Sequence, residues 1–276
     1  MSLASRFGRT RTRTEHRSAS ALTNDEIRRF APSILADGPH LSRSARYTHL
    51  PTVEILDGLR GEGFHPFMVA QSRTRDESRR EFTKHLVRLR HASQIQQQGE
   101  TPEIILINSH DGSSSFQLLA GCFRFVCANG LIVGDEYADV RVQHKGDVKG
   151  EVIEGAYRVL GEFDRVRGEI EGMKGTHLSQ DEQLAFGRAA LALRYEEGQA
   201  PISEYRVIES RRSDDEGSDL WRVFNRAQES LVRGGQLGRR GGRRARVREI
   251  TGIDQSVGLN RALWVLAGEM QKLRSH

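Results

Sequence analysis

The sequence predicts an α+β protein in which an antiparallel β-meander of four or more strands precedes long amphipathic helices. Segments between residues 64 and 144 are rich in β-forming side chains, and the connections between them are too short for the helical crossover that parallel strands require. From residue 148 onward, apolar side chains recur every three or four residues, which is the spacing of helices that bury one face. Strands first and helices afterwards indicate the α+β class.

Residues 1–20 are expected to form a flexible basic arm, because arginines alternate there with Ser, Thr and Gly and no apolar period is visible. The arginines of this arm are Arg6, Arg9, Arg11, Arg13 and Arg17. Thr23 and Glu26 then have the spacing of a capping box, which predicts a short helix ending at Phe30. A second short helix is expected at residues 53–59.

The expected strands cover residues 64–72, 82–91, 103–109, 115–127 and, as two short strands, 131–144. The charged stretch 73–80 is interpreted as a hairpin loop between the first two strands. Asp111-Gly112 and Asn129-Gly130 are turn signals between the later ones.

Apolar spacing over residues 148–173 predicts one long amphipathic helix against the sheet. Ser179 and Glu182 form a second capping-box pattern, and Asp219 and Asp254 are expected to cap the last two helices. The chain is therefore expected to divide into a basic arm at 1–20, an α+β core domain at 21–210, and a helical C-terminal region at 211–276 with an Arg/Gly-rich linker at 233–248.

The composition favours an anionic partner. The 276 residues carry a formal net charge of +5 at pH 7, and arginine supplies most of the positive charge. Guanidinium groups pair bidentately with phosphate and stack on flat bases. No apolar run approaches the roughly 20 residues of a membrane span, no signal-peptide pattern is visible, and Cys122 and Cys127 are the only cysteines, so a cytoplasmic protein without membrane contact is expected.

Motifs that would indicate an enzyme are missing. The sequence contains no phosphate-binding loop, no dinucleotide-binding glycine pattern, and no zinc-protease or serine-hydrolase motif. His85 and His91 are interpreted as surface or edge histidines too far apart to share a metal, and Asp214-Asp215-Glu216 as a solvated loop. We expect no catalytic residues, no metal and no cofactor, with a metal-dependent nuclease as the enzymatic alternative.

The strongest functional signal is the segment 233–248, which holds seven arginines and no acid. Its glycines prevent either flanking helix from continuing, so a mobile loop or ribbon is expected. Arginines beside exposed backbone N–H groups suit a phosphate chain, and a solvated charged loop is the alternative interpretation. The candidate phosphate contacts are Arg233, Arg239, Arg240, Arg243, Arg244, Arg246 and Arg248.

Two weaker candidate sets lie in the sheet region. Arg73 and Arg75 belong to the first hairpin tip, and Arg88 and Arg90 are expected to line a groove for a nucleic-acid backbone. Phe123 and Phe125 share a strand face, where they are either core residues or a stacking platform for bases. Trp221 and Trp264 are expected in the core or at a subunit interface.

Three stretches resemble a known family: FRFVCANGLIVGD at 123–135, LWRVFNRAQESLVRGG at 220–235 and GIDQSVGLNRALWVLAGEM at 252–270. Together they are similar, over roughly residues 45 to 274, to the uncharacterised phage- and plasmid-borne family labelled "phage/plasmid-like protein". The resemblance implies a mobile-element setting and carries over no catalytic residues. At fold level only, the order of strands and helices resembles single-strand annealing proteins of the Rad-fifty-two type, which assemble into rings around a basic groove.

These observations lead to one functional hypothesis and, besides the nuclease, one non-enzymatic alternative. The hypothesis is a DNA-binding protein that holds single-stranded DNA by its phosphates and promotes annealing and recombination without ATP or metal, as a homo-oligomeric ring or filament. The alternative is a non-enzymatic anti-defence factor that binds an acidic face of a host protein.

Overall fold

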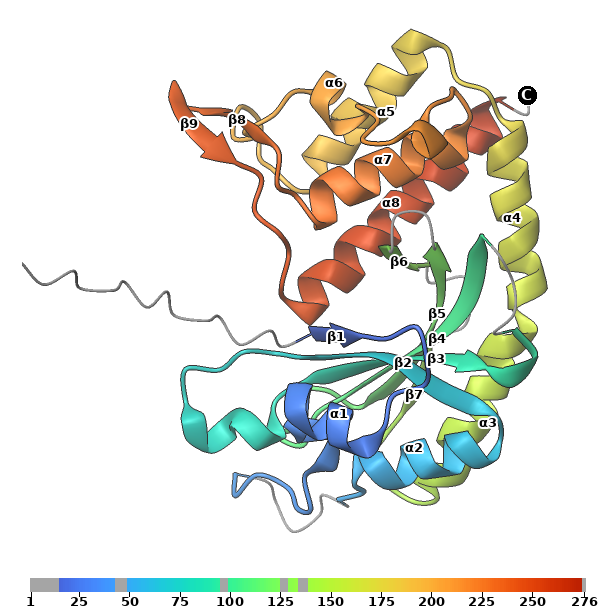
Figure 1. Cartoon of the computed structure of the whole chain (residues 1–276), viewed down its shortest axis with the longest axis vertical. Coiled ribbons are helices and arrows are strands. Elements are labelled where there is room, and N and C mark those ends of the chain that lie inside the picture. Colours follow the sequence, from blue (N-terminus) through green and yellow to red (C-terminus); the bar gives the residue numbers. More distant parts are fainter. Residues whose placement is uncertain (1–14, 43–48, 95–98, 125–128, 134–138, 275–276) are drawn as a thin grey trace, which may run out of the picture.

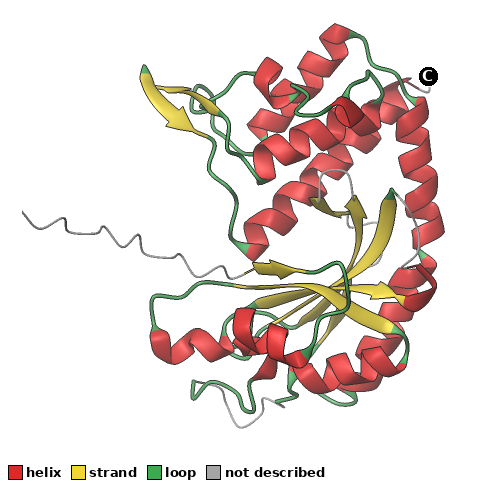
Figure 2. Ribbon diagram, viewed as in Figure 1, coloured by secondary structure: helices red, strands yellow, loops and turns green. Residues whose placement is uncertain are grey.

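The computed structural model describes residues 15–42, 49–94, 99–124, 129–133 and 139–274 (Figures 1 and 2). A curled antiparallel sheet has the strand order β1-β2-β3-β4-β5-β6, and β7 pairs with β5 beside β6. The strands are β1 (Glu15–Arg17), β2 (Phe64–Gln71), β3 (His85–His91), β4 (Glu100–Asn108), β5 (Phe116–Arg124), β6 (Asn129–Ile132) and β7 (Val140–Val142). The α+β class is confirmed.

Helices flank this sheet in two groups (Figure 1). The first group lies below the sheet in that view and comprises α1 (Asn24–Phe30), η1 (Pro32–Leu35), α2 (Thr52–Gly61) and α3 (Val148–Gly161). The second group forms an upper helical layer with α4 (Phe163–Gly175), α5 (Gln180–Ala192), α6 (Glu204–Val207), α7 (Leu220–Val232) and α8 (Ile253–Arg274). Three further 3-10 turns are η2 (Glu77–Phe82), η3 (Ala92–Gln94) and η4 (Ser213–Asp215), and β8 (Leu237–Arg240) pairs with β9 (Arg243–Arg246) in a separate hairpin.

The capping signals in the sequence are confirmed in most places. Thr23 and Ser179 each accept a backbone hydrogen bond from the glutamate three residues later, and each glutamate side chain bonds back to the cap. Asp219 accepts from the backbone N–H of Arg222 at 3.0 Å. The exception is Asp254, which lies inside the first turn of α8 and makes an ion pair with Lys84 at 2.8 Å.

The prediction of one continuous helix over residues 148–173 is wrong. The segment divides at Glu162 into α3 and α4. Gly161 precedes the break, and glycine is a poor helix former that lets the chain change direction. The division lets α3 pack on β5 and β7 while α4 continues along α7 and α8. A straight helix would leave the buried face of one half without a partner.

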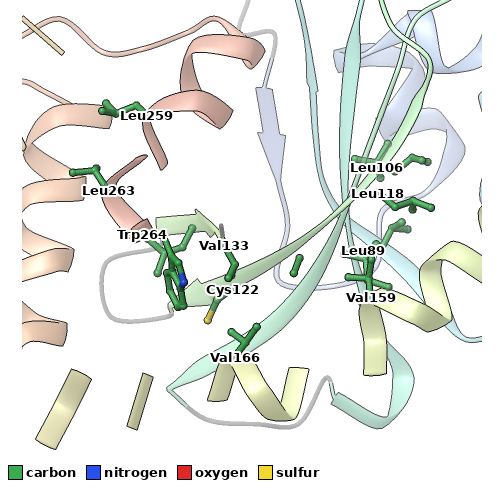
Figure 3. Close-up of a cluster of buried hydrophobic side chains, with 14 of the residues drawn as sticks. Leu89, Leu106, Leu118, Cys122, Val133, Val159, Val166, Leu259, Leu263 and Trp264 are labelled. Carbon is green, nitrogen blue, oxygen red and sulfur yellow. The ribbon is translucent and has the colours of Figure 1, made fainter. Parts of the chain in front are cut away.

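One large apolar cluster joins the sheet to both helical groups (Figure 3). Leu89, Leu106 and Leu118 of neighbouring strands lie near Val159 of α3, while Cys122 lies near Trp264 of α8. The cluster includes residues from Leu22 to Ala267, on both sides of the expected boundary near residue 210. The division into a core domain and a C-terminal region stays a prediction. None of the described helices has the length and apolar content that crossing a membrane requires.

The prediction of a flexible arm is wrong for residues 15–17. Residues 15–17 form β1, an edge strand in which Arg17 pairs with Met68 of β2. Arg6, Arg9, Arg11 and Arg13 lie outside the described residues. Backbone pairing therefore fixes Arg17 against the sheet, where its side chain is half-buried.

Candidate nucleic-acid interface

The Arg/Gly-rich segment forms an ordered β-hairpin rather than a mobile loop. Gly241 and Gly242 connect β8 to β9 with φ angles of 55° and 76°. Two consecutive positive φ values are the geometry of a type I′ turn, whose twist matches that of paired strands and which favours glycine. The two glycines, which were expected to make the segment mobile, therefore form the turn of the hairpin.

Register divides the hairpin side chains between two faces, because residues directly opposite each other in an antiparallel pair share a face. The pairs are Leu237 with Arg246, Gly238 with Ala245, Arg239 with Arg244, and Arg240 with Arg243. The face of Gly238 lies on the loop at 199–202, since a Cβ atom at Gly238 would stand 1.7 Å from the Pro201 carbonyl oxygen. On the same face, the Arg240 guanidinium donates to Gln199 Oε1 at 2.9 and 2.7 Å.

The opposite face points away from the body of the protein, and we call it the outward face: Leu237, Arg239, Arg244 and Arg246. Its three arginines are exposed and make no ion pair within the described part of the chain. Leu237, 64% exposed, lies among them. Arg239 and Arg244 stand directly opposite each other, and like charges at such positions destabilise a hairpin unless an anion neutralises them.

The base of the hairpin is firmly attached to the helical layer. Val247 is fully buried, and the Arg211 guanidinium donates to the Gly234 carbonyl at 3.0 Å. The Arg194 guanidinium donates to the backbone carbonyls of Leu231 and Arg248, one on each side of the hairpin, and burial lowers the pKa of Arg194. These contacts attach the hairpin to the helical layer, and Figure 1 shows β8 and β9 beside that layer, to the left of α6 and α7.

The other predicted arginines differ in their surroundings. Arg233 caps α7 and lies 3.9 Å from Glu229, so an acid already accompanies it. Arg248, just after the hairpin, is exposed. Arg73 and Arg75 are also exposed, in the connection between β2 and β3. Figure 1 shows that connection at the lower left and the β8–β9 hairpin at the upper left, so the structure does not join the two sets into one patch.

The prediction that Arg88 and Arg90 line an open groove is wrong. Only 4% of Arg88 and 3% of Arg90 is exposed, and both bond to Glu103 of β4. Arg88 Nη1 donates to Glu103 Oε2 at 3.0 Å, and Arg90 Nε and Nη2 donate to Glu103 Oε1 at 3.0 and 2.9 Å. The alternation that places these arginines on one strand face does not reveal that an acid on the neighbouring strand shares that face.

Phe123 is not an open stacking platform. It is 6% exposed, and the guanidinium carbons of Arg17 and Arg90 lie 4.6 and 4.5 Å from its ring centroid. Phe125 lies outside the described residues. The tryptophans are core residues: Trp221 and Trp264 are 2% and 3% exposed, and their rings meet edge to face.

Two polar groups expected at the surface are buried. Asp215 is 1% exposed and binds Arg124 and Arg212, so the acidic stretch at 214–216 is not wholly solvated. His85 is fully buried on a central strand, where burial lowers its pKa to about 4. Within the described residues, no group of His, Cys, Asp or Glu side chains has the arrangement of a metal site. Burial raises the pKa of the Cys122 thiol, which makes it unreactive.

With this geometry established, comparison with known proteins identifies the family. Residues 39–264 match the family described as "Domain of unknown function (DUF932)". The chain belongs to this family. It is 49% identical to the UPF0380 protein YafZ of Escherichia coli (strain K12) over 266 residues, which cover 96% of each chain. It is 48% identical, with the same coverage, to the UPF0380 protein YfjQ of the same organism. No solved structure matches.

Membership of DUF932 confirms the expectation of an uncharacterised family. The mobile-element setting and the fold-level likeness to annealing proteins stay predictions. Sequence reasoning missed Leu237 of the hairpin, and it named Arg17 only as one arginine of the N-terminal arm, not as a residue of the sheet. The exposure of Leu237 beside the arginines could have been predicted. Gly241-Gly242 lies between two four-residue segments, which is a hairpin pattern, and a hairpin of known turn length fixes which side chains share a face. For Arg17, nothing in the arm's composition distinguished it from the arginines before it.

Proposed function

We propose that this DUF932 protein binds single-stranded DNA through its phosphates, with the outward face of the β8–β9 hairpin as the contact surface. The observation that carries the proposal is the set of exposed guanidiniums at Arg239, Arg244 and Arg246, which make no ion pair within the described residues. Guanidinium groups suit phosphate because their planar fork donates two parallel hydrogen bonds. A hairpin whose base is already fixed loses little conformational freedom on binding.

Strand annealing follows as the activity that this mode of binding favours. A protein that grips phosphates leaves the bases free to pair with a second strand. Such a grip needs neither nucleotide hydrolysis nor a metal ion. Assembly of several copies into a ring or filament would place many weak sites along one strand and raise the overall affinity. DNA annealing by a homo-oligomer is therefore part of the proposal.

The test is to replace Arg239, Arg244 and Arg246 with Ala and to titrate a fluorescent single-stranded oligonucleotide, following anisotropy at several salt concentrations. We expect at least a tenfold loss of affinity at moderate salt. Each phosphate contact to a single strand contributes about 0.7 to the slope of log affinity against log salt, so the slope should decrease by about 2.

A matched variant controls for net charge: Arg28, Arg158 and Arg165 changed to Ala, which removes three exposed arginines from α1, α3 and α4. Its affinity should fall much less than that of the hairpin variant. Equal losses would mean that only overall charge matters, and unchanged affinity in the hairpin variant would remove the hairpin from the site. A wild-type protein that binds no oligonucleotide would favour the acidic host-protein partner instead.

A further inference from the structure

Arg17 on the edge strand β1 packs against an aromatic ring and a second arginine. Its guanidinium carbon lies 4.6 Å from the centroid of Phe123, and the Arg90 guanidinium packs on the same ring at 4.5 Å and on Phe67 at 4.5 Å. Arg17 Nη1 is buried and has no hydrogen-bond partner within the described residues. Removing a guanidinium N–H group from water without a hydrogen-bond acceptor costs free energy. A bound anion would supply the acceptor and lower that cost.

No described acid pairs with Arg17. The negative charges of Glu103 and Glu15 act on Arg17 without an ion pair to either, and the two oxygens of Glu103 already accept three hydrogen bonds from Arg88 and Arg90. Burial, followed by the positive charge of Arg88, lowers the pKa of Arg17 to about 10. Repulsion from a neighbouring guanidinium therefore adds to the desolvation of Arg17.

We propose that Arg17 binds an oxyanion of the phosphate type at the Phe123 side of this cluster, with the anion accepting a hydrogen bond from Arg17 Nη1. β1 is the edge strand and the Arg17 side chain as a whole is half-buried, whereas Nη1 is covered, so an anion that enters from this edge has to displace the atoms over Nη1. Stacking on the Phe123 ring orients the planar guanidinium, and because the ring contacts its face, the N–H groups in its plane are the ones that bind the ligand. This site uses no residue of the outward face.

The experiment measures thermal unfolding of the full chain as sodium phosphate replaces sodium chloride at constant pH and ionic strength. For the wild type we expect a saturable rise in melting temperature, since a ligand that binds only the folded state stabilises it. The rise should persist in the variant with Arg239, Arg244 and Arg246 changed to Ala, and disappear in Arg17→Met. Loss of the hairpin function and loss of this site are thereby distinguished.

Arg17→Met also separates a binding role from a structural one. Methionine keeps the apolar length against Phe123 and removes an unpaired buried charge, so in chloride alone the variant should melt no lower than the control Arg28→Met, which alters an exposed arginine of α1. The proposal is overturned if the wild type shows no phosphate-dependent rise, if Arg17→Met keeps the rise, or if Arg17→Met melts below the control in chloride.

Two further ligands distinguish the possible sources of the phosphate group. Thymidine monophosphate carries a terminal phosphate, and the dinucleoside phosphate of two thymidines carries only a backbone phosphodiester. A rise in melting temperature with both, lost in Arg17→Met, assigns the site to a nucleic-acid backbone. A rise with the monophosphate and inorganic phosphate alone assigns it to a free phosphate ligand.

Discussion

At the scale of single residues, two buried histidines show how the fold controls charge. His85 Nδ1 lies 3.0 Å from Ser33 Oγ, and its Nε2 lies 2.9 Å from Thr52 Oγ1. His110 Nε2 shares the same threonine oxygen at 3.2 Å. Burial lowers the pKa of His85 to about 4, and burial together with His85 lowers the pKa of His110 to about 2. Both imidazoles are therefore neutral at neutral pH.

These pKa values predict that the protein loses stability in mild acid. In the unfolded chain each histidine titrates near its ordinary pKa of about 6.5, so below that pH the unfolded state binds more protons than the folded state. The free energy of unfolding should fall by up to about 2 kcal/mol per histidine between pH 6.5 and pH 5. Urea unfolding at pH 7.5, 6.5 and 5 measures the fall. His177→Gln, at an exposed position, should leave it unchanged, and a flat profile would contradict the prediction.

The different surroundings of two arginines show which feature of the site could not be predicted from the sequence. Arg88 and Arg239 look equivalent in the sequence, since each is expected on a strand or ribbon beside other arginines. Arg88 is neutralised by Glu103 of the adjacent strand, whereas Arg239 stands opposite another arginine. Strand register decides which of these occurs. A single sequence carries the alternation of side chains but not the register of one strand against the next.

At the scale of elements, local signals predicted local structure. Capping boxes, turn glycines and β-rich runs placed most helices and strands, because each depends on residues within one turn or one strand. The division between α3 and α4 depended instead on where α7 and α8 pack, and the helical layer that contains them includes residues more than 50 positions later. The hairpin was missed as an ordered element although its Gly-Gly turn is a recognised signal.

The attachment of the hairpin yields a test at this scale. Gly238→Ala would place a Cβ atom 1.7 Å from the Pro201 carbonyl oxygen, so the hairpin must move away from the loop at 199–202. The hydrogen bond from Arg239 N to Pro201 O, 2.8 Å long, should be lost, and the variant should be about 1–3 kcal/mol less stable.

Limited trypsin digestion reports the change directly, because trypsin cleaves after the arginines of β8 and β9. Cleavage in the hairpin should be several-fold faster in Gly238→Ala than in the wild type. Gly61→Ala adds the same methyl group at a position with no atom within 4 Å and should digest like the wild type. Equal digestion of the two variants would show that Gly238 does not hold the hairpin in place.

At the scale of the whole molecule, buried ion pairs connect the sheet to the helical layer. Arg124 at the end of β5 binds Asp215, and Arg212 bridges Asp215 and Glu229 of α7 at 2.7 Å to each. Trp221 of α7 donates to Glu100 of β4 at 2.9 Å. Asp215 thus receives two guanidiniums while being 1% exposed. The orientation of the hairpin relative to the sheet depends on this junction, because α7 leads directly into the hairpin.

Asp215→Asn is therefore expected to weaken the molecule as a whole. The amide cannot neutralise Arg124 or Arg212, and removing one partner of a buried ion pair costs about 3 kcal/mol or more. Asp214→Asn makes the same change of charge one residue earlier at an exposed position, where the effect should stay within about 0.5 kcal/mol. Urea unfolding of the two variants measures the difference. If Asp215→Asn and Asp214→Asn lose the same stability, the buried carboxylate does not stabilise the junction. Apolar packing of α7 and α8 on the sheet would then hold the sheet and the helical layer together alone.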